Sequence, residues 1–361
     1  MKKRKIGARA ALCLCLLLAL TLASCAGCTE PKPTAMQFGS LSLSSDIYSF
    51  WLCCYRAQFA QIETDENRES LATLADTNIR KSLIAAAIFD DMNLSLDAFA
   101  RNQIEGAMRS LVDLYGSREA LDEALAAYGI DYEGLRRAIS YEQKAAALSN
   151  YLFGTGGVYE PSADERKDYY EQLYARVHII TILHVDFELD ANGERIFDRA
   201  SGKYLYAEKS PEALAAKLDK EAELRAQLSD GMDPIAFQQL LAAYNDDPTG
   251  AEYPNGYYFA KGGDYREYIE EIPKAALEMD VGTVTEVESE YGTHFLLRLP
   301  PADGAYDDEE NKDFFGDFYA RMQSYYFELY IAQFLPQVKV NYDVLATVRY
   351  EDCEPNFDIY W

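Results

Sequence analysis

Hydrophobic residues recur every three or four positions between residue 46 and about residue 174, which predicts a run of amphipathic helices. Asp46 is expected to cap the first of them. Ser162-Ala-Asp-Glu165 has the order of a capping box and predicts the start of the last one. The glycine-rich residues 153–157 are interpreted as a hinge. The predicted helices cover residues 47–62, 71–92, 95–115, 117–128, 131–148 and 162–174.

At Arg176 the spacing changes to an alternation of period two. Residues 177–185 are rich in β-branched side chains and predict a strand, on which His178 and His184 share one face because they are an even number of residues apart. Asp190-Ala-Asn-Gly193 supplies the residues of a hairpin turn. Further strands are expected at 257–259, 283–287 and 293–299, and helices at 210–228, 234–244 and 265–279. The order of these elements predicts an α+β module.

The C-terminal part predicts a long helix over 307–335, which is rich in aromatic residues, and a final strand over 338–350. A helix this apolar requires a packing partner, and the N-terminal helices are the expected one. Both flanks would then form one all-α domain, with the α+β module inserted between them.

Basic residues followed by a short apolar stretch, residues 10–22, predict that the chain begins with an export signal. Leu22-Ala-Ser-Cys25 resembles the lipobox of bacterial lipoproteins, in which cleavage precedes the cysteine and its sulfur carries a lipid. This resemblance implies lipidation at Cys25 and a location on the extracytoplasmic face of the bacterial cell membrane. Ordinary signal cleavage, with Cys25 incidental, is the alternative. Residues 25–45, rich in Pro, Thr, Ser and Gly, are interpreted as a tether.

The other cysteines of the mature chain do not form an obvious disulfide framework. Cys25 and Cys28 have the Cys-x-x-Cys spacing of redox proteins, but lipidation of Cys25 would exclude that use. Cys53 and Cys54 lie on an expected apolar helix face, where a buried cysteine acts as a small hydrophobic residue.

The chain is strongly acidic, with a formal net charge of -26. Removal of residues 1–24, which carry five basic residues, would leave 337 residues (361 minus 24) with a charge of -31 (-26 minus 5). This charge argues against nucleic acid as a partner, because phosphate binding depends on Lys and Arg. It is compatible with basic or unfolded polypeptides, and also with a charge that serves only solubility.

Three histidines are present in the whole chain, and all of them lie in the α+β module: His178, His184 and His294. The chain lacks His-Glu-x-x-His, Gly-x-Ser-x-Gly and a Walker-type glycine loop. We therefore expect no metal, no cofactor, no hydrolase chemistry and no use of ATP.

Between about residues 175 and 300 the chain contains an ordered series of segments: Phe237-Gln-Gln-Leu240, Tyr244-Asn-Asp-Asp247-Pro248, Asn255-Gly-Tyr-Tyr-Phe259, Val281-Gly282 and Tyr291-Gly-Thr-His294. With this series the region resembles the parvulin family of peptidyl-prolyl isomerases. The helical region before it resembles that of PrsA- and SurA-type foldases. Together these resemblances imply a four-stranded antiparallel sheet with helices, inserted into a chaperone-like helical domain.

The resemblance also implies the site. His178 and His294 would meet across neighbouring strands, and Asp247 would face the substrate carbonyl, so these three residues are the expected catalytic set. For each histidine, a buried structural role is the alternative, and Asp247 could equally be a turn residue before Pro248. His184 has no counterpart and is expected to have a structural or surface role.

The expected proline pocket departs from the family pattern. Positions that are usually apolar are occupied by Asn255, Asp264 and Tyr268, and burial of such groups against a prolyl ring would be costly unless they were paired. Aromatic side chains could rebuild the platform. The complete set of expected substrate-binding residues is Asn255, Tyr257, Phe259, Asp264, Tyr265, Tyr268 and Tyr291.

Three functions are compatible with these patterns. The first is an anchored foldase that isomerises X-Pro bonds in newly exported polypeptides, and the second is an ATP-independent holdase with a weak or inactive parvulin-like module. A solute-binding lipoprotein is disfavoured because the N-terminal half does not supply an α/β lobe. A homodimer through the helical domain is left open. The expected domains are residues 1–24, 25–45, 46–174, 175–302 and 303–361.

Overall fold

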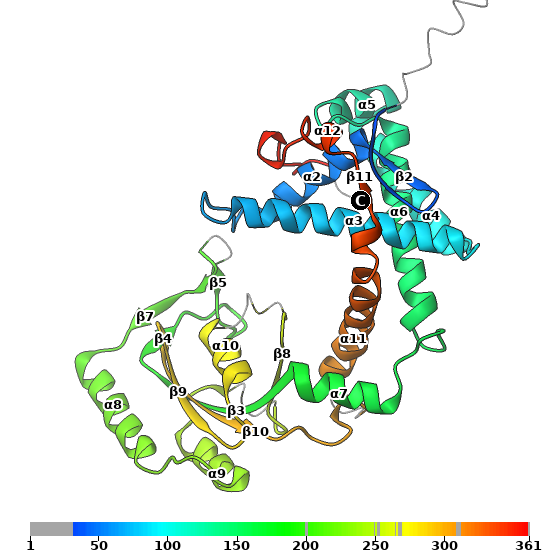
Figure 1. Cartoon of the computed structure of the whole chain (residues 1–361). Helices are drawn as coiled ribbons and strands as arrows, with labels where there is room; N and C mark the ends of the chain where they lie inside the picture. The colour runs from blue at the N-terminus through cyan, green and yellow to red at the C-terminus, as the bar shows by residue number, and fades with distance from the viewer. Residues whose placement is uncertain are drawn as a thin grey trace, which may run out of the picture. The chain divides into compact units, whose positions relative to one another are not determined.

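The computed structural model describes residues 32–198, 201–248, 250, 253–263, 265, 269–307 and 312–359, without the side chains of residues 312, 313 and 315–317. The chain forms two compact units (Figure 1). The central unit is Tyr159–Tyr325, and the flanking unit comprises Met1–Val158 and Tyr326–Trp361. Because the flanking unit is built from both ends of the chain, the predicted insertion of the module is confirmed.

The flanking unit is mainly helical, as predicted. Asp97, Ser117 and Asp131 each accept a hydrogen bond from a backbone N–H three residues later, which fixes the start of a helix. Gly116, with φ of 84°, ends one helix in the left-handed conformation. The helices are α2 (Ser45–Phe59), α3 (Arg68–Asp91), α4 (Ala98–Tyr115), α5 (Arg118–Ala126), α6 (Tyr132–Phe153) and α12 (Tyr342–Leu345), with 3-10 turns at η3 (Leu335–Gln337) and η4 (Tyr350–Asp352).

A small antiparallel sheet also belongs to the flanking unit, so this unit is not all-α. Its strand order is β11-β1-β2, with β1 at Thr34–Phe38, β2 at Leu41–Ser44 and β11 at Lys339–Val340. The prediction of a tether over 25–45 is therefore wrong for its second half. Met36 and Leu43 are fully buried in the core, and Met36 pairs with Val340, a contact that local composition cannot reveal.

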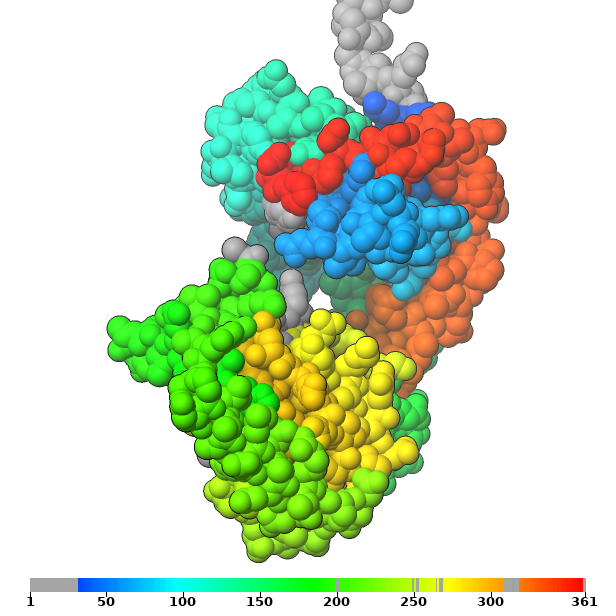
Figure 2. Space-filling model, turned by 90° about the vertical axis from the view of Figure 1, so that its left-hand side faces the viewer, coloured from blue at the N-terminus to red at the C-terminus, as the bar shows by residue number. Residues whose placement is uncertain are grey.

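The C-terminal segment lies against the N-terminal helices of the same unit, as Figure 2 shows in red and blue. Arg56 of α2 donates to the carbonyls of Glu351 and Cys353. The expected strand over 338–350 is wrong except for Lys339–Val340, because the chain turns into α12 directly afterwards. Asp46 is also not a cap: α2 starts at Ser45, and Asp46 is buried within its first turn.

The central unit is built on a four-stranded antiparallel sheet of order β8-β3-β10-β9. Its strands are β3 (Tyr174–Leu183), β8 (Tyr257–Ala260), β9 (Val284–Ser289) and β10 (Gly292–Leu299). The helices that pack on it are α8 (Pro211–Arg225), α9 (Pro234–Tyr244) and α10 (Glu271–Glu278). Leu224 and Phe237 of α8 and α9 cover one face, and Ile272 and Ala276 of α10 cover the other. The predicted α+β class and sheet are confirmed.

Short strand pairs extend from the end of β3. Asp190 accepts backbone hydrogen bonds from Asn192 and Glu194, which closes the predicted hairpin turn. The pairs are β4 (Val185–Phe187) with β7 (Tyr206–Glu208), and β5 (Phe197–Asp198) with β6 (Lys203–Tyr204). Ser210 caps α8 before Pro211, at the start of the helix that the sequence predicts over 210–228.

The central unit extends beyond the expected residues 175–302 because an aromatic cluster joins both of its ends to the sheet. The capping box at Ser162 starts α7 (Ala163–Leu173), and a 3-10 turn, η2 (Ala305–Asp307), precedes the long helix α11 (Lys312–Ala332). These elements supply the aromatic cluster, which consists of Tyr169, Tyr170, Tyr174, Tyr306, Phe314 and Phe318.

Substitution of Gly292 by Ala should disrupt the pairing of β3 with β10. Gly292 has φ of 150°, and a Cβ there would lie 2.1 Å from the carbonyl oxygen of Ile182, so the strands would have to separate. We expect a loss of about 2–3 kcal/mol in the unfolding free energy of the central unit, measured by hydrogen exchange of β10 amides. Gly106→Ala in α4 is the control, because no atom lies within 4 Å of the position of a Cβ there. It should stabilise the flanking unit by about 0.5–1 kcal/mol. Unchanged exchange in Gly292→Ala would contradict this register.

Candidate functional site

The two histidines that were expected to meet lie on opposite faces of the sheet. In the register of β3 with β10, His294 pairs with Thr181 and His178 pairs with Leu297. Paired residues of antiparallel strands share a face, and residues 178 and 181 are an odd number apart, so their side chains point in opposite directions. The sequence prediction that His178 and His294 are neighbours is therefore wrong.

His294 is the buried centre of one face. Its Nδ1 is hydrogen-bonded to Thr181 Oγ1 at 3.0 Å, and its Nε2 to Ser289 Oγ at 2.8 Å. Burial lowers its pKa to about 4, although Asp247 acts in the opposite direction. The imidazole is therefore neutral at neutral pH, with one ring nitrogen donating and the other accepting.

His178 belongs to the core on the other face. Its ring is stacked on Phe237 of α9, with ring centroids 6.4 Å apart. Gln238 Nε2 donates to its Nε2 at 3.0 Å. Burial, together with the positive charge of Arg176, lowers the pKa of His178 to about 4. These contacts are those of a packed histidine that is satisfied within the core.

The loop after α9 continues the hydrogen bonding of β3 where β8 no longer pairs with it. Asn245 Oδ1 accepts from the N–H of Thr181 at 2.8 Å, and Asp246 Oδ2 accepts from that of Leu183 at 3.0 Å. Burial alone would raise the pKa of Asp246, but hydrogen bonds from Lys217, Leu183 and Lys220 outweigh it and lower that pKa. This anchoring fixes the backbone that carries Asp247.

Asp247 faces the same side of the sheet as His294. Arg195 forms an ion pair with its carboxylate at 3.0 Å, and the guanidinium of Arg195 also lies over the ring of Phe187, 4.3 Å from its centroid. The loop that carries Arg195 is thus tied to the loop that carries Asp247.

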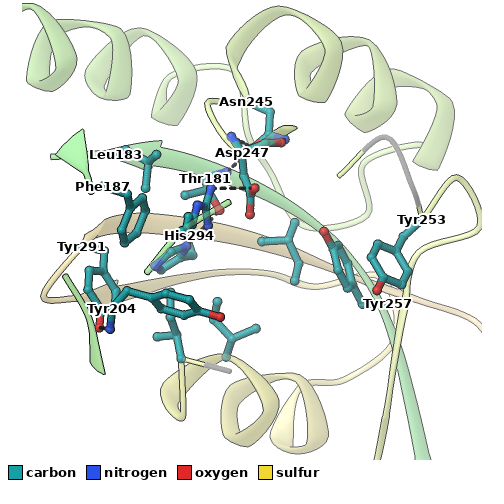
Figure 3. Close-up of a pocket in the computed structure, with 14 residues that line it drawn as sticks. Thr181, Leu183, Phe187, Tyr204, Asn245, Asp247, Tyr253, Tyr257, Tyr291 and His294 are labelled. Atoms are coloured by element: carbon teal, nitrogen blue, oxygen red, sulfur yellow. Dashed lines mark hydrogen bonds and ion pairs between the residues drawn. The ribbon is translucent and has the colours of Figure 1, made fainter. Parts of the chain in front are cut away.

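These groups surround a cavity of about 300 Å³. Figure 3 shows Thr181 and His294 at its centre and Asn245 and Asp247 at one border. Aromatic side chains lie on both sides of this polar centre: Phe187, Tyr204 and Tyr291 on one, and Tyr253 and Tyr257 on the other. Ile179, Ile269 and Ile272 add apolar lining. The cavity therefore offers apolar walls around a small polar centre, as is common in ligand sites.

Only some of the expected substrate-binding residues line the cavity. Tyr257 and Tyr291 line the cavity. Phe259 is buried in the core beneath α10, and Tyr265 packs against it with its hydroxyl donating to the carbonyl of Ala260. Asn255 is exposed, and its carbonyl accepts from Arg176. These three do not line the cavity.

Several expected positions lie outside the described residues. They are Asp264 and Tyr268 of the expected proline pocket, and Cys25 and Cys28 near the N-terminus. Of the three polar or aromatic replacements expected in the proline pocket, only Asn255 is among the described residues. It does not line the cavity.

His184 is held by an ion-pair network at the side of the sheet. Its Nε2 lies 2.9 Å from Glu221, a buried carboxylate that also accepts from Arg225. Burial would raise the pKa of Glu221, but hydrogen bonds from His184 and Arg225 lower it below its ordinary value. The expectation of a structural place for His184 agrees with these contacts.

Sequence reasoning missed six polar or aromatic residues of the cavity: Thr181, Phe187, Arg195, Tyr204, Asn245 and Tyr253. Thr181 lies on the face of β3 opposite to that of His178. Choosing this face requires the register of β3 with β10, in which Thr181 pairs with His294. Asn245 lies within the segment Tyr244-Asn-Asp-Asp247-Pro248, of which only Asp247 was expected to be in the site. Arg195 and Phe187 belong to the hairpin after β3 and carry no recognisable motif.

Within the ranges that the structure describes, no group of three or more His, Cys, Asp or Glu side chains could hold a metal ion. In the same ranges, no helix is both long and apolar enough to cross a membrane.

Comparisons with known proteins find solved structures that are similar to the chain. No protein-family profile and no curated protein match the chain. Similar solved structures are PrsA from Bacillus subtilis (18% identity, 81% of this chain and 87% of that chain, TM-score 0.20), the peptidylprolyl isomerase PrsA from Bacillus anthracis (16%, 73% and 94%, 0.26) and the foldase protein PrsA from Lactococcus lactis (13%, 88% and 98%, 0.24). At these identities and TM-scores the likeness carries no conclusion about activity or substrate. PrsA is also one of the two types of protein that the helical region of the sequence resembles.

Proposed function

We propose that the central unit binds X-Pro segments of unfolded polypeptides in the cavity around His294 and accelerates their cis/trans isomerisation. The observation that carries the proposal is the buried, neutral imidazole of His294, bonded to Thr181 and Ser289 and facing Asp247 within apolar walls. No metal, cofactor or nucleophile is required, because isomerisation only rotates the imide bond.

Rotation about the imide is slow because it breaks amide resonance. A protein accelerates it by binding the twisted imide better than the planar one. The twisted imide has lost resonance and is less polar, so the apolar walls would favour it. Both ring nitrogens of His294 are already hydrogen-bonded, so His294 acts by orienting the Thr181 hydroxyl. That hydroxyl would stabilise the changing charge on the imide oxygen or nitrogen by hydrogen bonding.

The direct test is exchange NMR on a peptide that contains one X-Pro bond. The proposal expects cis and trans signals to exchange faster in the presence of the protein, and no acceleration over the free peptide would remove the enzyme claim. Binding of the same peptide, followed by shifts of its signals, is measured separately.

Thr181→Val is expected to lower the catalysed exchange rate about 10-fold or more. The substitution keeps the shape of the side chain but removes the hydroxyl that orients His294, so both ring tautomer and ring position are less defined. Thr283→Val, in the turn that precedes β9, is the matched control and should leave the rate unchanged. A Thr181→Val protein with the wild-type rate would exclude this hydroxyl from the site.

A holdase is the second candidate. It is favoured by one observation: the β3 residue that faces His294 is Thr181, where the resemblance implied a second histidine. Such a cavity could hold prolyl and aromatic segments without speeding their isomerisation. Suppression of client aggregation without any acceleration of exchange would support this candidate.

We also propose that the protein is anchored by a lipid on Cys25 at the extracytoplasmic face of the bacterial membrane, where newly exported chains emerge. The support is the sequence pattern of a signal followed by Leu22-Ala-Ser-Cys25. Cys25→Ser should abolish incorporation of labelled palmitate, and continued labelling would contradict the anchor site.

A further inference from the structure

Two buried cysteines, Cys53 and Cys353, belong to the core of the flanking unit, where α2 meets the C-terminal segment. Cys53 is 3% exposed and Cys353 is 7% exposed, and both are part of one hydrophobic core. They lie 300 residues apart in the chain (353 minus 53) and are present as free thiols. The proposed function of the central unit makes no use of either residue.

Backbone hydrogen bonds hold the two segments together on both sides of these cysteines. The carbonyl of Cys53 accepts from the N–H of Asn356 at 2.9 Å. In the other direction, Arg56 donates to the carbonyl of Cys353. Arg56 lies three residues after Cys53 and therefore on the same side of α2. The C-terminal segment is thus fixed against the turn of α2 that contains Cys53.

The two side chains are hydrogen-bonded to each other between these backbone contacts. The hydrogen bond from Cys53, together with the positive charge of Arg56, lowers the pKa of the Cys353 thiol, although burial acts in the opposite direction. The same hydrogen bond and burial raise the pKa of Cys53. Cys353 is therefore the sulfur that more readily becomes a thiolate, which is the nucleophile in thiol–disulfide exchange.

Cys54, the neighbour of Cys53 in the sequence, is placed differently. Consecutive residues of a helix point in directions that differ by about 100°. The sulfur of Cys54 accepts from Asn356 Nδ2 at 3.3 Å, and it lines a cavity that neither Cys53 nor Cys353 lines. Burial raises the pKa of Cys54 to about 12. Cys54 is therefore a control thiol within the same turn of α2.

We propose that Cys53 and Cys353 form a disulfide bond that joins α2 to the C-terminal segment. The oxidant is a small disulfide such as oxidised glutathione, which the Cys353 thiolate attacks while the C-terminal segment docks, before both sulfurs are covered. Cys53 then attacks the sulfur of Cys353. The S–S bond of the oxidant breaks, the S–S bond of the protein forms, and the two thiol protons pass to the two released thiolates. The bond closes a loop that contains the whole central unit, and it would form even if that unit bound no proline.

Peptide mapping of the full chain tests this. The protein is reduced and unfolded, refolded with oxidised and reduced glutathione, alkylated at its free thiols and digested with chymotrypsin. Cleavage after aromatic residues separates residues 52–55 from the earlier cysteines and releases residues 351–357. We expect these two peptides to be joined, with one cysteine of 52–55 alkylated and two hydrogen atoms fewer than in the separate peptides. Recovery of both peptides unjoined and fully alkylated would overturn the proposal.

Two variants assign the bond. Cys54→Ser should keep the joined peptides, whereas Cys53→Ser should lose them. A second measurement is urea unfolding of the flanking unit, followed by tryptophan fluorescence, since both tryptophans of the chain belong to this unit. Reduction with dithiothreitol should shift the midpoint to lower urea concentration in the wild-type and Cys54→Ser proteins and leave it unchanged in Cys53→Ser, because the bond constrains the unfolded chain. A bond through Cys54, or a wild-type midpoint that reduction does not shift, would contradict the proposal.

Discussion

Phe318→Ala is expected to destabilise the central unit by about 3–5 kcal/mol, the usual cost of removing a fully buried aromatic ring. Phe318 is 0% exposed and packs against Tyr306 with ring centroids 4.7 Å apart, and against Tyr174 at the start of β3 at 5.7 Å. Phe318 belongs to α11, and Tyr174 belongs to the sheet. A loss of stability measured in the sheet would therefore show that the aromatic cluster joins α11 to it. Hydrogen exchange of β3 and β10 amides measures the effect.

Leu329→Ala on the same helix is the control. Leu329 is 50% exposed, and we expect a change of no more than about 0.5 kcal/mol. Equal exchange in the Phe318→Ala and Leu329→Ala proteins would mean that the central unit ends before α11, near the boundary of residue 302 that the sequence suggested.

The stability of the central unit should fall as the pH is lowered from about 6.5 to 4. Burial lowers the pKa of both His178 and His294 from 6.5 to about 4. Between these values the unfolded chain binds protons that the folded chain does not, so the unfolding free energy decreases as the pH falls. Each histidine contributes at most about 3 kcal/mol over this window, at 1.36 kcal/mol per pKa unit.

Hydrogen exchange of β10 amides between pH 7 and 4.5, corrected for the intrinsic exchange rate, measures this dependence. Replacement of both histidines by Gln should remove most of the slope. Carboxylates such as Asp246, whose pKa is lowered in the fold, lose their contribution only at lower pH, below the ordinary carboxyl pKa of about 4. A pH-independent stability between 7 and 4.5 in the wild-type protein would show that neither histidine is buried as described.

The parts of the fold that the sequence predicted depend on local signals. The capping box that begins at Ser162 and the hairpin turn Asp190-Ala-Asn-Gly193 each depend on residues within about four positions, and both were predicted correctly. The hairpin of β1 and β2 was missed because it is completed by β11, about 300 residues later, and its residues look like a linker when taken alone.

The site was predicted only in part, because the sequence does not reveal the register of β3 with β10. His294 and Asp247 do border one cavity, but His178 does not, because a shift of one residue in the pairing of β3 with β10 reverses the face of every side chain. Residue type alone favoured His178 over Thr181. The register that decides between them depends on contacts across more than 100 residues, which periodicity along one strand does not reveal.

The central claim is that the site is built around His294 and not around the pair of histidines. The most direct measurement compares catalysed cis/trans exchange of one X-Pro peptide, by exchange NMR, in the His294→Gln and His178→Gln proteins at neutral pH, with folding checked by amide exchange. We predict that His294→Gln loses about 10- to 100-fold of the catalysed rate, whereas His178→Gln retains it within about twofold when equally folded. Equal losses in both proteins, or a larger loss in His178→Gln, would contradict the account.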